Sequence, residues 1–239
     1  MAQQLLRKRG HVHGRPGVRI DHHEVVIAVD RVEVAGAPDR EIRQETGTIG
    51  EQDPGDLVAV DPDDPRLEPL IQACGATGTV ALVGAPVAAS DGAKSIGVLM
   101  VDGSGTAVVY RKMWLGDAER DVFEPGTTPS VVEVDGWRIG LAVCKDTGIG
   151  GHAAATIALG VDVYAAGVVE HAVDSEVQSQ RAARIVRDHR VWVAVASHAG
   201  PTGEGFDVTA GGSAIWDSRG TRVAVCDGRP GGVVTAAIH

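Results

Sequence analysis

From Leu57 onward, short apolar runs alternate with amphipathic stretches, and this alternation restricts the chain to folds that stack helices on sheets. The apolar runs are bounded by turn-forming residues and have the length of buried strands. Strands are expected over residues 79–83, 95–101, 106–110, 130–134, 137–143, 161–166, 191–196, 211–217 and 221–226. Helices are expected over residues 64–74, 152–159 and 175–189. The pattern predicts an α/β sandwich.

Gly-containing turns fix how several of these strands connect. Asp102-Gly-Ser-Gly105 and Asp135-Gly136 are each flanked by apolar runs, which is typical of hairpins. A charged loop over residues 111–129 lies between the two hairpins and contains Lys112.

The N-terminal segment has a different character. Residues 1–43 hold eight Lys/Arg against six Asp/Glu and four of the nine His, whereas the remainder holds 14 Lys/Arg against 26 Asp/Glu. Residues 25–29 could form a strand, but no amphipathic helix follows them. We therefore divide the chain into an atypical segment, 1–56, expected to be solvated or poorly ordered, and a domain over 57–239. Without a native-like segment 1–56, one strand of the domain would keep an unpaired edge.

Composition excludes several classes of function. The formal net charge is −10 and aromatic residues make up 3% of the chain, so we expect no nucleic-acid partner. No apolar run is long enough to span a bilayer, and no apolar region follows the basic start, so neither a membrane nor a secretory signal is expected. Cys74, Cys144 and Cys226 form an odd set without paired spacing, which indicates free thiols in the cytoplasm.

Cys144 ends an apolar run, Trp137–Val143, and a Gly-rich turn leads from it toward the predicted helix 152–159. A nucleophile on a sharp turn between a strand and a helix is exposed to substrate. The nearby helix N-terminus would favour the thiolate. By itself, a free Cys is more often a small buried apolar residue, so its neighbours decide the interpretation.

Three patterns together resemble the nitrilase, or carbon–nitrogen hydrolase, superfamily. They are the run Tyr110-Arg-Lys-Met-Trp-Leu115, the run Glu119-Arg-Asp-Val-Phe-Glu-Pro-Gly126, and the Cys144 turn followed by Asp146. Residues 181–197 and 211–220 are similar to further parts of the family pattern, so the likeness covers roughly 57–235. The resemblance implies a four-layer α-β-β-α sandwich.

The resemblance also implies the chemistry, which is hydrolysis of a non-peptide C–N bond in a small amide, ureide or carbamoyl compound through a cysteine thioester. Cys144 would attack the carbonyl carbon, and Lys112 with the backbone N–H of Lys145 would stabilise the oxyanion. Glu119 would help to place the base and the substrate. The pocket would be lined by Asp146, Thr147, His152 and residues 167–171. The resemblance implies neither a cofactor nor a metal. It does imply a homodimer or a larger homo-oligomer.

The general base is the least well matched position. Glu45-Thr-Gly-Thr-Ile-Gly50 keeps the spacing between the family's glutamate and a following glycine, but the preceding residues are polar where the family has a buried strand. Glu45 is the candidate base, and a solvated acid in a loop is the competing interpretation.

Other functions stay open. The chain could be an inactive relative that serves as a binding or assembly subunit, or an acyltransferase that uses the same thioester. A Cys–His protease pair with His152 lacks an orienting third residue. The Gly-rich run 147–151 lacks the strand–GxGxxG–helix frame of a dinucleotide site. The His residues near the N-terminus lack the spacing of a zinc site.

Overall fold

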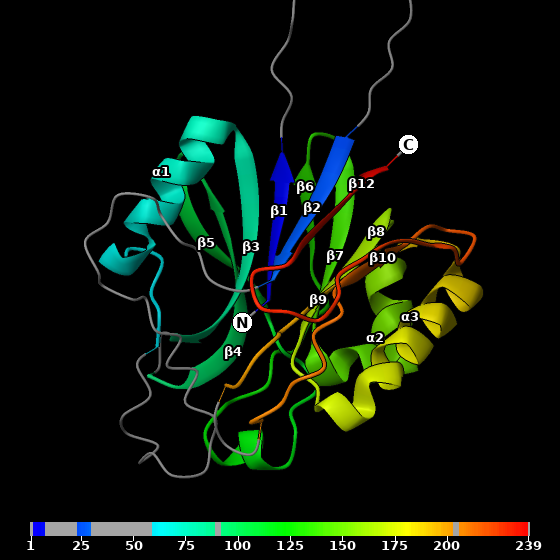
Figure 1. Ribbon diagram of the computed structural model, residues 1–239. Coiled ribbons are helices and arrows are strands. Elements are labelled where there is room, and N and C mark those ends of the chain that lie inside the picture. The colour runs from blue at the N-terminus through cyan, green and yellow to red at the C-terminus, as the bar shows by residue number, and fades with distance from the viewer. Residues whose placement is uncertain (1, 8–22, 30–58, 89–91, 203–205, 239) are drawn as a thin grey trace, which may run out of the picture.

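The computed structural model describes residues 2–7, 23–29, 59–88, 92–202 and 206–238, and it contains two six-stranded sheets that face each other (Figure 1). The first sheet has the order β12-β2-β1-β3-β4-β5, from strands Val233–Ile238, His23–Val29, Ala2–Arg7, Thr79–Ala88, Lys94–Asp102 and Gly105–Arg111. The second has the order β11-β10-β9-β8-β7-β6, from strands Arg222–Val225, Ala214–Trp216, Trp192–Ser197, Val163–Val168, Trp137–Val143 and Val131–Val134.

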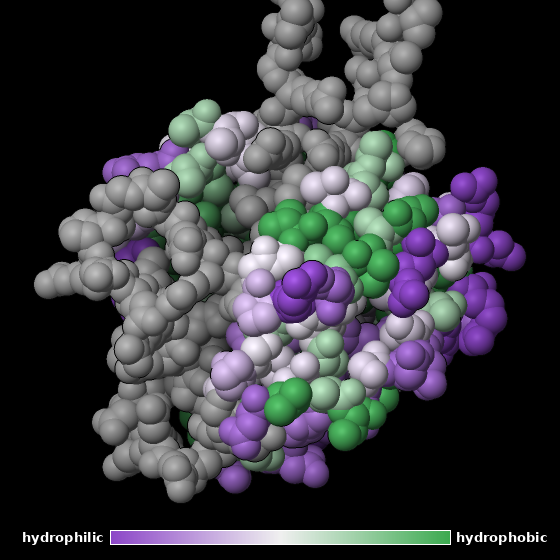
Figure 2. Space-filling view, viewed as in Figure 1, coloured by the Kyte–Doolittle hydropathy of each residue, from purple (hydrophilic) through white to green (hydrophobic). Residues whose placement is uncertain are grey.

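Helices cover the outer faces of the two sheets (Figure 1). Helix α1 (Glu68–Thr77) packs on β3 and β4, whereas α2 (Gly150–Ile157) and α3 (Ser175–His189) pack on the second sheet. This is the predicted four-layer α-β-β-α sandwich. Hydrophilic side chains gather on the side of the molecule where α3 lies (Figure 2).

Alternation along β3 shows how the sequence specifies the layers. Val80 and Leu82 point into the core between the sheets, where they join Leu141 of β7. Ala81 and Val83 point to the other face and pack with the α1 side of the sheet. Both faces are apolar because successive side chains of a strand point to opposite faces and both faces are covered.

The second sheet places three parallel strands side by side. β7 pairs with β8, and β8 pairs with β9, both in parallel register. Parallel neighbours need crossover connections, and α2 and α3 supply them. The ends of β7 and β8 therefore lie at the same edge of the sheet, and the loops that follow them come together there.

Most predicted elements are confirmed with small shifts in their bounds. The helix predicted over 175–189 has those bounds, and both Gly-turn hairpins form. The first helix continues past Gly75 to Thr77, because Gly75 packs closely on Gly103 and the left-handed residue that ends the helix is Gly78, with φ 64°. The C-terminal strand β12 was not predicted; its residues alternate between exposed and half-buried up to Ala237, and Ile238 is buried.

The N-terminal segment differs from the expectation that it stands outside the α/β pattern. β1 and β2 pair with each other, β1 pairs with β3, and β2 pairs with β12. These pairings cover the edge of β3 that faces β1, so β3 has no unpaired edge there. The proposed boundary between residues 56 and 57 lies outside the described residues. Within them, no helix has both the length and the apolar character needed to cross a bilayer.

Candidate active site

Cys144 sits where β7 ends and a short 3-10 helix, η3 (Cys144–Gly148), begins. Its φ is 46°, in the left-handed region that residues with a Cβ rarely adopt. Such a conformation persists only where the surroundings hold it, and it is common at functional sites. The predicted sharp turn is thus present, with η3 between Cys144 and α2.

Hydrogen bonds on both sides of Cys144 hold this turn. Asp146 Oδ2 accepts from the backbone N–H of Val143 at 2.9 Å, and Thr147 Oγ1 donates to the Cys144 carbonyl at 2.7 Å. From α3, Arg184 donates to the Thr147 carbonyl at 2.7 Å and to the Gly148 carbonyl at 3.2 Å. Arg184 therefore satisfies carbonyls at the end of η3, which a short helix leaves unpaired.

Lys112 follows β5 directly, and its backbone is fixed between two segments. Its N–H donates to Ile96 O at 2.7 Å, and its carbonyl accepts from Gly126 N at 2.8 Å. A side chain at Gly126 would collide with Arg111 O, since an added Cβ would lie 2.2 Å from that oxygen. Glycine at 126 thus lets the charged loop close against the strand end that carries Lys112.

The ammonium of Lys112 is buried, with 1% of the residue exposed, and it is paired with Glu119. Its Nζ lies 2.5 Å from Glu119 Oε1 and 2.6 Å from Oε2, and Oε2 also accepts from Gly116 N at 2.5 Å. Both carboxylate oxygens are therefore engaged, so Glu119 serves as an anchor for Lys112. An ammonium has three N–H donors, and one has no partner among the described residues.

The sulfur of Cys144 lies in the field of several charges. Burial raises the pKa of the Cys144 thiol above its ordinary value, the Lys112 ammonium opposes this, and the Glu170 and Glu119 carboxylates reinforce it. In the isolated protein, removal of water outweighs the charges that favour the thiolate, so the net shift of the thiol pKa is upward. The site joins Cys144, Lys112 and Glu119, and it adds Glu170.

Asp146 and His152, which were expected to line the pocket, are both buried and hydrogen-bonded within the protein core. Asp146 is fully buried, and it accepts from Tyr110 Oη at 2.8 Å and from Trp114 N at 3.0 Å. His152 is 2% exposed, with Nε2 2.8 Å from Tyr110 Oη and Nδ1 3.0 Å from Tyr164 Oη. Thr147, also predicted to line the pocket, is 4% exposed.

These contacts allow one consistent placement of protons. The Tyr110 hydroxyl must donate to Asp146, because a carboxylate only accepts. His152 Nε2–H then donates to Tyr110 Oη, and Nδ1 accepts from the Tyr164 hydroxyl. Burial lowers the pKa of His152, which keeps the imidazole neutral as this assignment requires, although Asp146 acts in the opposite direction. The network ties the Lys112 strand end to the Cys144 turn.

Lys145 extends away from the sulfur. Its Nζ donates to the Leu115 carbonyl at 2.9 Å and lies 4.0 Å from Asp117. Its side chain therefore contacts the loop that carries Glu119, and the part of Lys145 available to the reaction is its backbone N–H, in the first turn of η3.

Glu45 lies outside the described residues. Within these residues, no group of three or more His, Cys, Asp or Glu side chains could hold a metal ion. Glu170 falls inside the predicted pocket range 167–171 but was not singled out, because a lone acid after a strand carries no motif.

Replacing Asp146 with alanine is expected to lower the free energy of unfolding by about 3 kcal/mol, because one buried and two partly buried donors would lose their acceptor. The melting temperature should fall by roughly 10 °C for a chain of this size. The control is Asp188→Ala, an exposed acid on α3 that pairs with Arg187 and should change the melt little. Equal melting temperatures for Asp146→Ala and the parent would contradict the supporting role.

The chain belongs to the carbon–nitrogen hydrolase family, whose model matches residues 43–239. Over 87 residues it is 33% identical to a Pseudomonas protegens protein described as a hydrolase in the pqqF 5' region. That match covers 35% of this chain and 30% of the relative.

Solved structures of the nitrilase superfamily share the fold. Nit3 from Saccharomyces cerevisiae superposes with a TM-score of 0.66 at 16% identity, covering 76% of this chain and 67% of Nit3. The NitN amidase from Nesterenkonia sp. AN1 superposes with a TM-score of 0.64 at 22% identity, covering 72% of this chain and 68% of the amidase. Other structures of that amidase contain butyramide, or acrylamide added at the active-site cysteine.

Proposed function

We propose that the protein hydrolyses the C–N bond of small amides through a thioester on Cys144. The observation that carries this proposal is the pairing of a strained, half-buried Cys144 with a buried Lys112 whose position Glu119 fixes. A cysteine held at positive φ and a buried ammonium are both unfavourable for stability alone, and amide chemistry explains why they occur together.

The first half of the reaction forms the thioester. Cys144 Sγ attacks the amide carbon while a base takes the thiol proton. The free N–H of Lys112 and the backbone N–H of Lys145 donate to the oxygen as it becomes negative. The C–N bond then breaks, and the proton passes to the leaving nitrogen, so ammonia or an amine departs and an acyl–sulfur bond remains.

The second half removes the acyl group. Water gives its proton to the base, its oxygen attacks the thioester carbon, and the C–S bond breaks to release a carboxylic acid and the thiol. We assign the base to Glu45, which keeps the family spacing. A base is required because burial keeps the resting thiol protonated. Both oxygens of Glu119 are already engaged, so Glu119 is a poor candidate for this role.

Covalent capture tests the proposal directly. The full chain is incubated with acrylamide and, separately, with a panel of short primary amides that includes butyramide. Each reaction is quenched in acid, and the masses of the intact protein and of its peptides are measured by mass spectrometry. We expect a single adduct on the peptide that contains Cys144, with ammonia released from at least one amide. Adducts on Cys74 or Cys226 alone, or no adduct and no ammonia with any compound, would reject the assignment.

A further inference from the structure

Glu170 stands beside the sulfur of Cys144, in the loop that follows β8. The Cys144 Sγ lies 3.7 Å from the carbonyl oxygen of Val169, the residue immediately before Glu170. The Glu170 carbonyl accepts from Ala210 N at 2.9 Å, which fixes the backbone at this point. The Glu170 side chain is 15% exposed, so its carboxylate is largely shielded from water but still reachable.

Arg181 of α3 holds one end of this carboxylate. Its Nη1 lies 2.5 Å from Glu170 Oε1, whereas Oε2 has no partner among the described residues. The guanidinium packs against Gly148, where a side chain would meet Nε at 3.4 Å. Arg181 also lines a small cavity beneath α3 together with Gln178. The guanidinium therefore lies on the α3 side of the ion pair.

The charges around the sulfur differ in how far they are compensated. Glu119 takes two N–H groups of Lys112, so that pair offers the substrate one donor and no free acceptor. Glu170 keeps one acceptor oxygen. Its negative charge also raises the pKa of the Cys144 thiol.

We propose that Glu170 recognises a protonated amino group on the acyl part of the substrate. The preferred substrates are then amides with an amino group one or two carbons from the scissile carbonyl. During attack the carbonyl carbon meets the sulfur, and Glu170 follows the residue whose carbonyl the sulfur contacts, so we place the recognised amino group within a few atoms of the scissile carbonyl. This inference rests on the proposed thioester chemistry and specifies the substrate class of the same site.

Isosteric pairs of amides test the inference, because they differ in charge but hardly in shape. β-Alaninamide is compared with butyramide, and glycinamide with propionamide. For the parent protein, kcat/KM should favour the amino amide by roughly 10-fold or more, the effect of one charge-assisted hydrogen bond. Glu170→Gln keeps an acceptor for Arg181 but loses the charge, so the preference should disappear.

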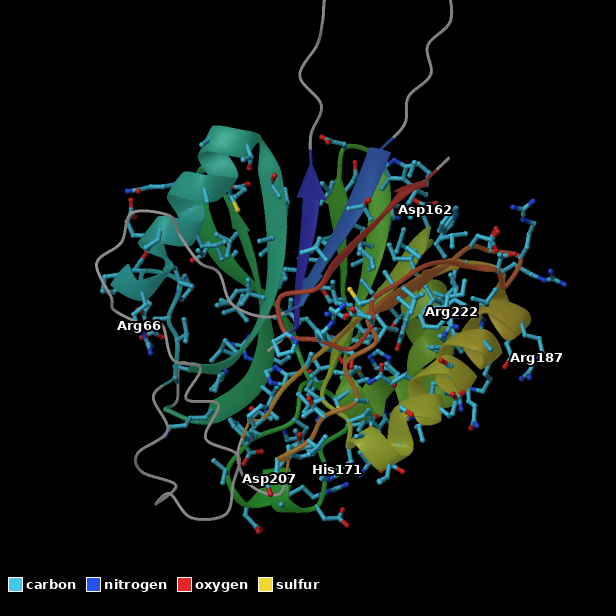
Figure 3. The ribbon with its side chains drawn as sticks, viewed as in Figure 1. Arg66, Asp162, His171, Arg187, Asp207 and Arg222 are labelled. Atoms are coloured by element: carbon cyan, nitrogen blue, oxygen red, sulfur yellow. The ribbon has the colours of Figure 1, made fainter. Side chains whose placement is uncertain are left out.

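Two further variants separate recognition from structural damage. Arg181→Gln leaves the Glu170 charge uncompensated, so the preference for the amino amide should increase. Arg187→Gln, an exposed position on the same helix (Figure 3), should leave the ratio unchanged. An equal loss for both members of a pair in Glu170→Gln, or no preference in the parent, would overturn the inference while the hydrolase proposal stands. Failure of every amide to acylate Cys144 would overturn both.

Discussion

Replacing Cys144 with alanine should lower the rate of ammonia release by about four orders of magnitude or more, because the proposed reaction makes and breaks the bond to the acyl group at the sulfur. Cys144→Ser should be nearly as inactive, since the serine hydroxyl is a far weaker acid than the thiol and would need a stronger base. Both variants should melt within a few degrees of the parent, as the hydrogen bonds of the turn involve the backbone and Asp146, Thr147 and Arg184.

A second cysteine provides the matched control. Cys226 is half-buried, and it lies directly after β11. Cys226→Ala should keep the parent rate, and it should be labelled by acrylamide at the same site as the parent. If Cys144→Ala retained hydrolysis, or if both variants lost it equally, the sulfur at 144 would not be the nucleophile.

Replacing Lys112 with methionine should lower kcat by roughly 100- to 1,000-fold, the usual effect of removing an oxyanion donor. It should also move the pH profile of Cys144 alkylation. Lys112 is the charge that opposes the raised pKa of the thiol, so its removal raises that pKa further. Less thiolate then exists at any given pH, and the alkylation profile should shift to higher pH. A shift to lower pH would contradict the arrangement.

Loss of folding must be separated from loss of catalysis in this variant. Lys112→Met leaves the partly buried Glu119 carboxylate without its cation, which destabilises the protein. The double variant Lys112→Met/Glu119→Gln removes both charges and should recover most of the melting temperature. If it also recovers hydrolysis, Lys112 acts through the fold; if hydrolysis stays low, Lys112 acts on the reaction.

Local sequence patterns predicted the frame of the site well. The Cys144 turn could be anticipated because a buried strand ends on it and glycines follow, and the Lys112 loop because hairpins flank it. Both depend on neighbours along the chain, where periodicity and turn chemistry act directly. The family resemblance then assigned roles to Lys112 and Glu119, and the structure brings both to Cys144.

Roles that depend on distant partners could not be predicted in this way. Asp146 and His152 follow Cys144 closely in sequence, so they were expected in the pocket. Tyr110 and Tyr164 reach them from other strands and bury them. The direction of the thiol pKa shift could likewise not be predicted, because the helix end is visible in the sequence whereas the extent of burial is not. β1 was missed because its segment lacks the regular alternation of the rest.

The hydrogen bonds from Arg184 to the Thr147 and Gly148 carbonyls affect how long the protein stays active on heating. The reactive turn is held partly by its own residues, Asp146 and Thr147, and partly by a side chain from α3. Detachment of that helix would remove the outer part of this support while leaving the pairing of both sheets intact. We therefore expect inactivation by heat to begin before global melting, and stronger contacts of α3 to prolong the working life of the protein.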